Sequence, residues 1–117
     1  MDSKEIELAK AIGKTIARYR QSQQLTQDEL AERLGIGNEA VSRIERGIVI
    51  PGIARLMELA CIFQCDTADL LRPASLCPSD QARYLEQRLA QLSNEDQQLV
   101  IGFVETLATR LAQTTAR

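Results

Sequence analysis

The chain has 117 residues, with 14 Lys or Arg, 16 Asp or Glu and no His, so its formal net charge at pH 7 is -2. Hydrophobic residues make up 44% and aromatic residues 3% of the sequence, which suits a small domain with an appendage and excludes a disordered composition. Because His is the commonest general base and zinc ligand, its absence argues for a binding protein and against an enzyme. Over the whole chain, the slight excess of acid argues against nucleic acid as a partner.

The first ten residues mix acidic and basic side chains, so they lack the basic start and apolar centre of a secretory signal. No stretch approaches the roughly 18 apolar residues of a membrane span. We therefore expect a cytoplasmic protein in which Cys61, Cys65 and Cys77 are reduced thiols. Cys61 and Cys65 lie four residues apart in an apolar helical pattern with no fourth ligand nearby. We expect both to fill the core, and we expect no metal and no cofactor.

Apolar residues recur at helical spacing along almost the whole chain, and no segment alternates as a strand does. The pattern therefore predicts an all-α fold. In the first predicted helix, one face carries Leu8, Ile12, Ile16 and Tyr19, and we expect this face to be buried. In chain order, the predicted helices cover residues 3–23, 26–35, 38–46, 53–64, 66–71, 80–92 and 93–113.

Two short helices in the first half of the chain carry their own start and stop signals. Thr26 can cap the earlier of the two, and Glu29 three residues later completes a capping box. A three-residue turn that begins at Gly35 separates it from the next helix, which Gly47 closes. Two short helices joined by a glycine turn are the sequence form of a helix-turn-helix.

A second kind of segment begins after residue 71. Residues 72–79 read RPASLCPS and hold two prolines and two serines, which predicts a linker. We therefore divide the chain into a domain over residues 1–72, a linker over 73–79 and a C-terminal helical region over 80–117.

The two short helices sit inside a longer pattern with fixed offsets. Residues 26–35 read TQDELAERLG and residues 41–47 read VSRIERG, and Pro51 and an apolar stretch over 56–71 follow. This pattern resembles the phage-repressor and Cro-like helix-turn-helix family, also called the xenobiotic-response-element family, over about residues 8–72. The resemblance implies a five-helix DNA-binding domain of a transcriptional regulator, here followed by a two-helix oligomerisation region.

The resemblance also implies that the helix over residues 38–46 lies in the DNA major groove, with its N-terminal residues against base edges. Val41 and Ile44 face inward in this helix, so the remaining side chains lie on its outer side. Their amide, carboxylate, methyl and guanidinium groups match the donors, acceptors and methyl groups of the bases. The residues expected to contact bases are Asn38, Glu39, Ala40, Ser42 and Arg43. An ordinary solvated helix face is the alternative interpretation.

Several polar residues outside that set are candidates for other roles. Gln27 opens the second helix and matches the family position that grips a phosphate. Arg46 and Arg55 lie near the same surface and are candidates for phosphate contacts, which fix register without reading sequence. Arg20 and Glu45 match the family positions that form a structural ion pair, and the resemblance implies that this pair orients the third helix.

The chain departs from the family pattern after Gly47. Family members often place polar or basic residues there to meet the DNA backbone, whereas this chain has Ile48, Val49 and Ile50. Phosphate binding is therefore not carried over to these three residues. Gly52 also stands where a Ser or Thr usually caps the fourth helix, and Gly is tolerated there at modest cost.

The last predicted helix has an apolar arc of roughly 220°, wider than the stripe of about 100° that one packing partner covers. We expect the chain to self-associate through this helix. The alternative is that the helix packs on the N-terminal domain of its own chain. The residues expected at the dimer contact are Leu99, Val100, Phe103, Val104, Leu107 and Leu111.

Together these features predict a sequence-specific, DNA-binding transcriptional regulator. We expect a repressor that binds double-stranded DNA at a palindromic operator as a homodimer, because one recognition helix reads only a few base pairs. Two alternatives stay open: the antitoxin of a toxin-antitoxin pair, with a toxin as a further partner, and a protein-interaction module that has lost DNA binding. Between Lys10 and Arg55 there are eight basic and five acidic residues, so this region is net basic and the acidic total does not count against DNA.

Overall fold

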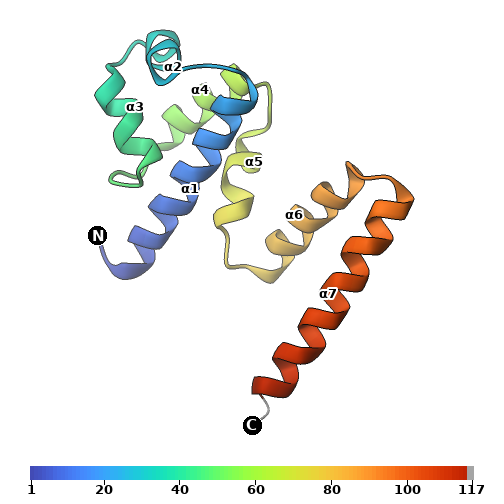
Figure 1. The fold of residues 1–117 in the computed structure, drawn as a ribbon. Helices are drawn as coiled ribbons and strands as arrows, with labels where there is room; N and C mark the ends of the chain where they lie inside the picture. The colour runs from blue at the N-terminus through green and yellow to red at the C-terminus, as the bar shows by residue number, and fades with distance from the viewer. Residues whose placement is uncertain (116–117) are drawn as a thin grey trace. The chain divides into compact units, whose positions relative to one another are not determined.

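The computed structural model of the protein describes residues 1–115, and every regular element in this range is a helix (Figure 1). The predicted all-α fold is therefore confirmed. The chain divides into two compact units, Met1–Gln81 and Ala82–Arg117. The elements in chain order are α1 (Ser3–Ser22), α2 (Gln27–Leu34), α3 (Asn38–Glu45), α4 (Ile53–Phe63), α5 (Thr67–Leu71), the short 3-10 helix η1 (Arg72–Ala74), α6 (Pro78–Ala90) and α7 (Asn94–Thr115).

The start and stop signals of α2 and α3 are confirmed. The Thr26 hydroxyl accepts a hydrogen bond from the backbone N–H of Glu29 at 3.1 Å, and the Glu29 carboxylate accepts one from the Thr26 N–H at 3.1 Å. Gly35 after α2 has a φ of 70° and Gly47 after α3 a φ of 75°, both in the left-handed region that glycine adopts without strain. The capping box at Thr26 and the left-handed glycine at position 47 therefore mark the start and the end of the helix-turn-helix.

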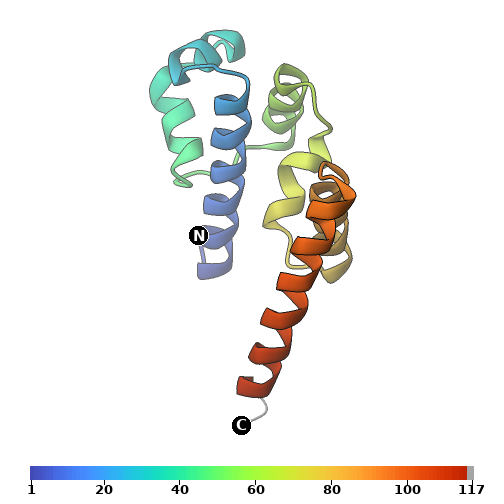
Figure 2. The same cartoon turned by 45° about the vertical axis from the view of Figure 1, so that its right-hand side comes forward.

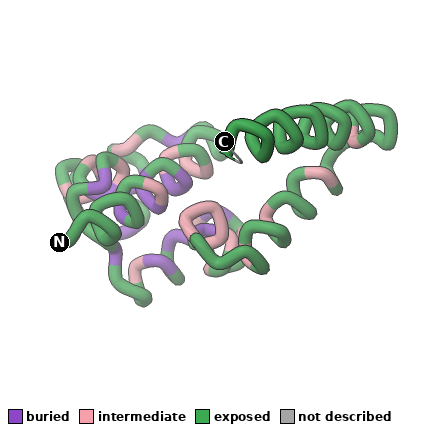
Figure 3. The backbone as a smooth tube through the Cα atoms, turned by 90° about the horizontal axis from the view of Figure 1, so that it is seen from below, coloured by how far each residue is buried: buried purple, intermediate pink, exposed green. Residues whose placement is uncertain are grey.

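The core of the first unit lies between α1 and the four helices that follow it. Figure 3 shows the buried residues only in this part of the chain. The Tyr19 and Phe63 rings stack with centroids 5.7 Å apart and close one side of the core. The buried residues that form the cluster are Ile12, Ile16, Leu30, Ala31, Leu34, Val41, Ile44, Leu56, Leu59, Ala60, Phe63 and Leu70.

The prediction for the buried face of α1 is correct for its centre and wrong for its first turns. Ile12 and Ile16 are buried, but Leu8 is exposed and its neighbour Ala9 is fully buried instead.

The backbones of α1 and α3 approach each other closely, and the two helices lie side by side in both views (Figures 1 and 2). A β-carbon on Gly13 would lie 2.4 Å from the carbonyl oxygen of Ile44 and 2.6 Å from that of Glu45. A β-carbon on Gly47 would lie 2.6 Å from the α-carbon of Lys10. The backbone of α1 therefore touches α3 at Gly13 and the turn after α3 at Gly47, and only glycine fits at either position.

The segment expected to be a linker contains some regular structure. η1 covers residues 72–74, and α6 begins at Pro78, two residues before the predicted start. Proline is well suited to a first helical position, because its missing N–H has no intrahelical acceptor there. The Ser75 hydroxyl donates a hydrogen bond of 2.7 Å to the Asp80 carboxylate across this start.

The prediction that both cysteines of α4 and its end fill the core is wrong for Cys61, which is exposed. Cys65 is half-buried against the core, and burial is the largest cause that raises the pKa of its thiol. Cys77 is exposed, and a hydrogen bond with Ser79 lowers the pKa of its thiol. Within residues 1–115, no group of three or more Cys, Asp or Glu is arranged to hold a metal ion.

The second unit has no buried residue in the part of α6 and α7 that the structure describes (Figure 3). Ser93 caps α7 by accepting a hydrogen bond from the Asp96 N–H at 3.2 Å. Leu99 and Phe103 are 74% and 68% exposed, which is unusual for large apolar side chains on a well-formed helix. None of the described helices is both long and apolar enough to cross a lipid bilayer.

Candidate nucleic-acid interface

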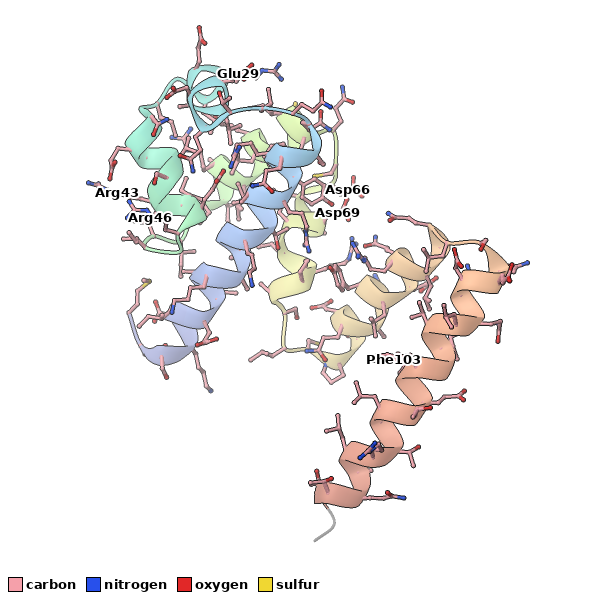
Figure 4. The ribbon with its side chains drawn as sticks, in the orientation of Figure 1. Glu29, Arg43, Arg46, Asp66, Asp69 and Phe103 are labelled. Atoms are coloured by element: carbon pink, nitrogen blue, oxygen red, sulfur yellow. The ribbon has the colours of Figure 1, made fainter. Side chains whose placement is uncertain are left out.

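The candidate interface is the outer face of α3 together with the residues that hold this helix in place. Val41 and Ile44 are buried and fix which side of α3 faces inward. Asn38, Glu39 and Arg43 are exposed on the other side. Figure 4 shows Arg43 and Arg46 extending away from the core. The exposed face therefore offers amide, carboxylate and guanidinium groups over two helical turns. Ala40 and Ser42, also in α3, are half-exposed.

A bidentate ion pair between Arg20 of α1 and Glu45 of α3 holds the far end of α3. The Arg20 Nε lies 2.7 Å from one carboxylate oxygen of Glu45, and its Nη2 donates to the other oxygen at 3.0 Å. The third guanidinium nitrogen donates to the carbonyl oxygen of Leu25 at 2.8 Å. The side chains are 13% and 6% exposed, and the hydrogen bond with Glu45 is the largest cause that raises the pKa of Arg20. Both charges of this pair are therefore neutralised inside the fold.

The same carboxylate also binds α2. The side-chain amide of Gln27 donates a hydrogen bond of 3.0 Å to Glu45 Oε1, so Glu45 joins α1, α2 and α3. For the phosphate grip expected of Gln27, one amide hydrogen is therefore already used. Because the Glu29 N–H is bound by the Thr26 hydroxyl, the donors that remain at this helix end are the second amide hydrogen of Gln27 and the backbone N–H groups of Gln27 and Asp28.

Glu39 lies between two arginines on the outer face of α3. Its Oε1 is 3.4 Å from a guanidinium nitrogen of Arg43 and 3.4 Å from one of Arg46. Arg46 also donates to the Ser42 hydroxyl at 3.1 Å. All three charged side chains are more than half exposed, so each pair contributes little to the free energy of folding. The arginines can exchange Glu39 for another anion at small cost.

Asn38 is tied to the preceding helix. Its side-chain amide donates a short hydrogen bond to the Asp28 carboxylate of α2. A bidentate contact with adenine needs both the amide N–H and the amide oxygen. Because only one of its two N–H groups is used, Asn38 retains the second one and the oxygen for a base edge. Asp28 fixes the direction in which the amide points.

A hollow of about 250 Å³ lies beside α3, along Ala40, Arg43 and Ile44. Ala40, Val49 and Pro51 contribute apolar surface to it, and Arg43 and Arg55 carry the charges at its edge. Arg55 also lies 3.4 Å from Glu58 in the next turn of α4. All three apolar residues that follow Gly47 are exposed, and one of them, Val49, lines this hollow together with Ala40 and Arg43 of α3.

Sequence reasoning did not identify Gly13 as a residue that positions this surface. The available signal was a glycine in the middle of a long helix, where it destabilises by roughly 1 kcal/mol relative to Ala unless close packing requires it. Its contact with the backbone of Ile44 and Glu45 sets the distance between α1 and α3.

Comparison with known proteins agrees with this geometry. A helix-turn-helix family model matches residues 16–70, which run from the middle of α1 to α5. The chain is also 32% identical over 73 residues to the uncharacterized HTH-type transcriptional regulator y4dJ of Sinorhizobium fredii (strain NBRC 101917 / NGR234). This similarity covers 62% of the chain and 95% of that protein. The chain belongs to the phage-repressor and Cro-like helix-turn-helix family of DNA-binding transcriptional regulators.

In this helix-turn-helix domain, α2 and α3 are the two helices of the motif and Gly35 opens the turn between them. By its place in the motif, α3 corresponds to the recognition helix of such domains. The family match ends at residue 70, so α6 and α7 lie outside it. Their role must be inferred from their own residues.

Proposed function

We propose that the protein is a transcriptional repressor that binds an inverted-repeat operator as a homodimer, with α3 of each copy in the major groove. The observation that carries this proposal is the rigid presentation of α3. Its inner side is fixed by Glu45, which binds both α1 and α2, and by the backbone contact at Gly13. Its outer side carries exposed polar groups that have only weak pairs to give up.

Within this proposal, Arg43 reads a guanine through its guanidinium and Asn38 reads an adenine through its amide. Glu39 accepts from a cytosine amine or keeps the arginines apart, and Ser42 donates to a nearby base or phosphate. Ala40 contacts a thymine methyl group. Gln27, Arg46 and Arg55 bind backbone phosphates, which fix the register of α3 on the duplex.

The homodimer is supported by the apolar side chains that α7 leaves exposed. None of these side chains is buried by the described part of the chain, and they lie on successive turns of α7. Every copy of the chain carries the same apolar face, so two copies can cover each other. The two-fold symmetry of such a dimer matches half-sites about 10 base pairs apart. The proposed contact residues are Leu99, Val100, Phe103, Val104, Leu107 and Leu111. This proposal includes a cytoplasmic location, where the operator is accessible.

The deciding experiment is a selection of bound sequences from a pool of random duplexes with the full-length protein. We expect an enriched inverted repeat, and we expect Arg43→Ala to lose the preference at one position in each half-site. Arg33→Ala is the matched control, because Arg33 is an exposed arginine on α2 and not on the outer face of α3. A pool with no enriched sequence at low salt would contradict the proposal.

A second candidate function is favoured by the exposed apolar residues of α7 together with Ile48 and Ile50. In this alternative the apolar surface meets a different protein, either the toxin of a toxin-antitoxin pair or the partner of an interaction module. Sedimentation of the purified chain separates the two cases. A monomer that becomes a complex only with a second protein favours the alternative, and a dimer of the chain alone favours the repressor.

A further inference from the structure

A second charged hollow lies on the other edge of α3, where its C-terminal end meets α1. It has a volume of about 500 Å³. Lys10 and Lys14 of α1 and Arg46 after α3 line it, together with the carboxylates of Glu7 and Glu45. None of the DNA-contacting residues proposed above, apart from Arg46, takes part in it.

The two lysines of this hollow are not neutralised by the fold. Glu45 is already bound by Arg20 and Gln27, so its charge is used on the inner side. The side chains of Lys10 and Lys14 have no ion pair or hydrogen bond within residues 1–115, whereas five arginines of this range have an acidic partner. Arg46 is paired with Glu39, so Glu7 is the single carboxylate of the lining left to oppose the two lysines. The hollow has an excess of positive charge.

The position of the lysines relative to α3 is fixed. Lys10 and Lys14 are four residues apart on α1, so they project from one face of the helix. The backbone of Lys10 contacts Gly47, and one turn later Gly13 contacts the carbonyl groups of Ile44 and Glu45. A movement of the lysines along α3 would require both glycine contacts to break. Two long cationic side chains are thus held beside the C-terminal end of the proposed recognition helix.

We propose that Lys10 and Lys14 bind a backbone phosphate of the operator, together with Arg46, at this edge of α3. This inference rests on the proposed function, because it requires α3 in the major groove. The ligand is a phosphodiester group of the strand that passes the C-terminal end of α3. Ammonium groups on flexible stems suit such a group, because they act as mobile point charges and require no fixed base geometry. The contact sets the tilt of α3 and adds affinity without sequence preference.

A structural role for the lysines makes a different prediction. Cations near the end of a helix stabilise its C-terminal carbonyl groups, and those of Ile44 and Glu45 face α1. In that case, removing the lysines lowers the thermal stability of the free protein and leaves the salt dependence of DNA binding unchanged. Binding of a phosphate instead changes the salt dependence, because each neutralised phosphate releases counterions.

The test compares full-length Lys10→Gln/Lys14→Gln with the wild type on the selected operator between about 50 and 200 mM KCl, a range over which phosphate binding is strongly salt-dependent. We expect the slope of log K against log salt to be less steep by about 0.9 for each phosphate that the variant no longer neutralises, with affinity reduced equally for the operator and a scrambled duplex. Lys4→Gln/Arg18→Gln is the matched control, because it removes two α1 cations that do not line this hollow. An unchanged slope, or an equal change in the control, would overturn the inference.

A second measurement locates the phosphate on the DNA. Operators with single neutral methylphosphonate groups are bound by the wild type and by Lys10→Gln/Lys14→Gln. We expect one or two positions at which the neutral group weakens the wild type and leaves the variant unaffected. If no position shows this difference, the inference is wrong although the proposed function stands. If the wild type selects no operator at all, the proposed function itself fails.

Discussion

A β-carbon placed on Gly13 would lie 2.4 Å from the carbonyl oxygen of Ile44, closer than side-chain carbons approach a backbone oxygen. The α1 and α3 backbones are thus in direct contact across the interior of the domain. A helix that presents polar groups to a partner needs a firm support on its inner side, and here the support is backbone against backbone.

Gly13→Ala is expected to destabilise the domain although Ala favours helix formation. The added carbon forces α1 and α3 apart, which typically costs about 1–3 kcal/mol, and the gain in helix propensity is about 1 kcal/mol. Urea unfolding followed by circular dichroism measures the net effect. Gly102→Ala is the control, because a β-carbon there meets nothing within 4 Å and only the favourable propensity remains. A higher urea midpoint for Gly13→Ala would contradict this assignment.

Glu45→Ala should be among the most damaging single changes in the domain. It leaves the guanidinium of Arg20 buried without its carboxylate, and removal of one partner of such a pair costs about 3 kcal/mol or more. In a double-mutant cycle, Arg20→Leu/Glu45→Leu should lose less free energy of unfolding than the sum of the losses of Arg20→Leu and Glu45→Leu, because the double variant leaves no charge unpaired. Glu58→Ala, which removes an exposed partner of Arg55, should cost less than about 1 kcal/mol. Equal losses of the free energy of unfolding for Glu45→Ala and Glu58→Ala would show that the buried pair stabilises the domain no more than the exposed one.

The capping box of α2 gives a pH dependence with a defined sign. The hydrogen bonds with Thr26 lower the pKa of Glu29 below its ordinary value. Because the folded-state pKa is the lower one, the contribution of this carboxylate to stability is present above the unfolded-state pKa and is lost as the pH falls through the folded-state pKa. Glu29→Gln should therefore be less stable than the wild type at pH 7, and the two should converge as the pH falls below the folded-state pKa of Glu29. Glu32→Gln, in the same helix but outside the cap, is the control. A difference that stays constant with pH would contradict the prediction.

Phe103→Glu should separate the proposed dimer into monomers without unfolding the chain, since this side chain is 68% exposed in the isolated chain. A charge at a symmetric apolar contact meets its own copy across the two-fold axis, so the effect is doubled. Analytical ultracentrifugation over a range of concentrations measures the change. Thr109→Glu is the matched control, because Thr109 lies on the polar side of the α7 wheel. Equal dimerisation of wild type and Phe103→Glu would exclude this face of α7 as the contact.

Replacement of single thymines by uracil tests the hollow beside Ala40, because it removes only the 5-methyl group. If a methyl group enters the surface formed by Ala40, Val49 and Pro51, one uracil per half-site should weaken binding about four-fold, the equivalent of roughly 0.8 kcal/mol for one buried methyl-sized group. Val49→Ser should reduce this difference, and Ile53→Ser, a change of an exposed residue that does not line the hollow, should not. Uniform tolerance of uracil at every position would rule out the contact.

The parts of the fold that sequence predicted are those decided by neighbours in the chain. The capping box of Thr26 and Glu29 and the left-handed glycines at positions 35 and 47 depend on residues close together in the chain, so their signals are complete in the sequence. The buried face of α1 depends on which segments cover it, and the pattern did not distinguish Leu8 from Ala9.

The same distinction holds for the candidate site. The pattern separates the inner from the outer residues of α3, because Val41 and Ile44 have helical spacing. It cannot show that the Asn38 amide is held by Asp28, ten residues away, because that bond depends on the angle between α2 and α3. Nor does it show that Glu39 lies between two arginines, since exposed side chains choose among several rotamers. The importance of Gly13 emerges only when α1 and α3 are placed in contact.

The full exposure of α7 has a consequence for how the proposed repressor responds to its own abundance. In the proposed dimer, this helix pair, which has no buried residue in its own chain, gains its cover when two copies meet, so the dimer fraction depends on the total amount of protein. At low copy number the dimer population rises with the square of the monomer concentration. Occupancy of the operator would then change more steeply than the expression level, and a modest dilution at cell division would release the promoter more completely than a monomeric binder could.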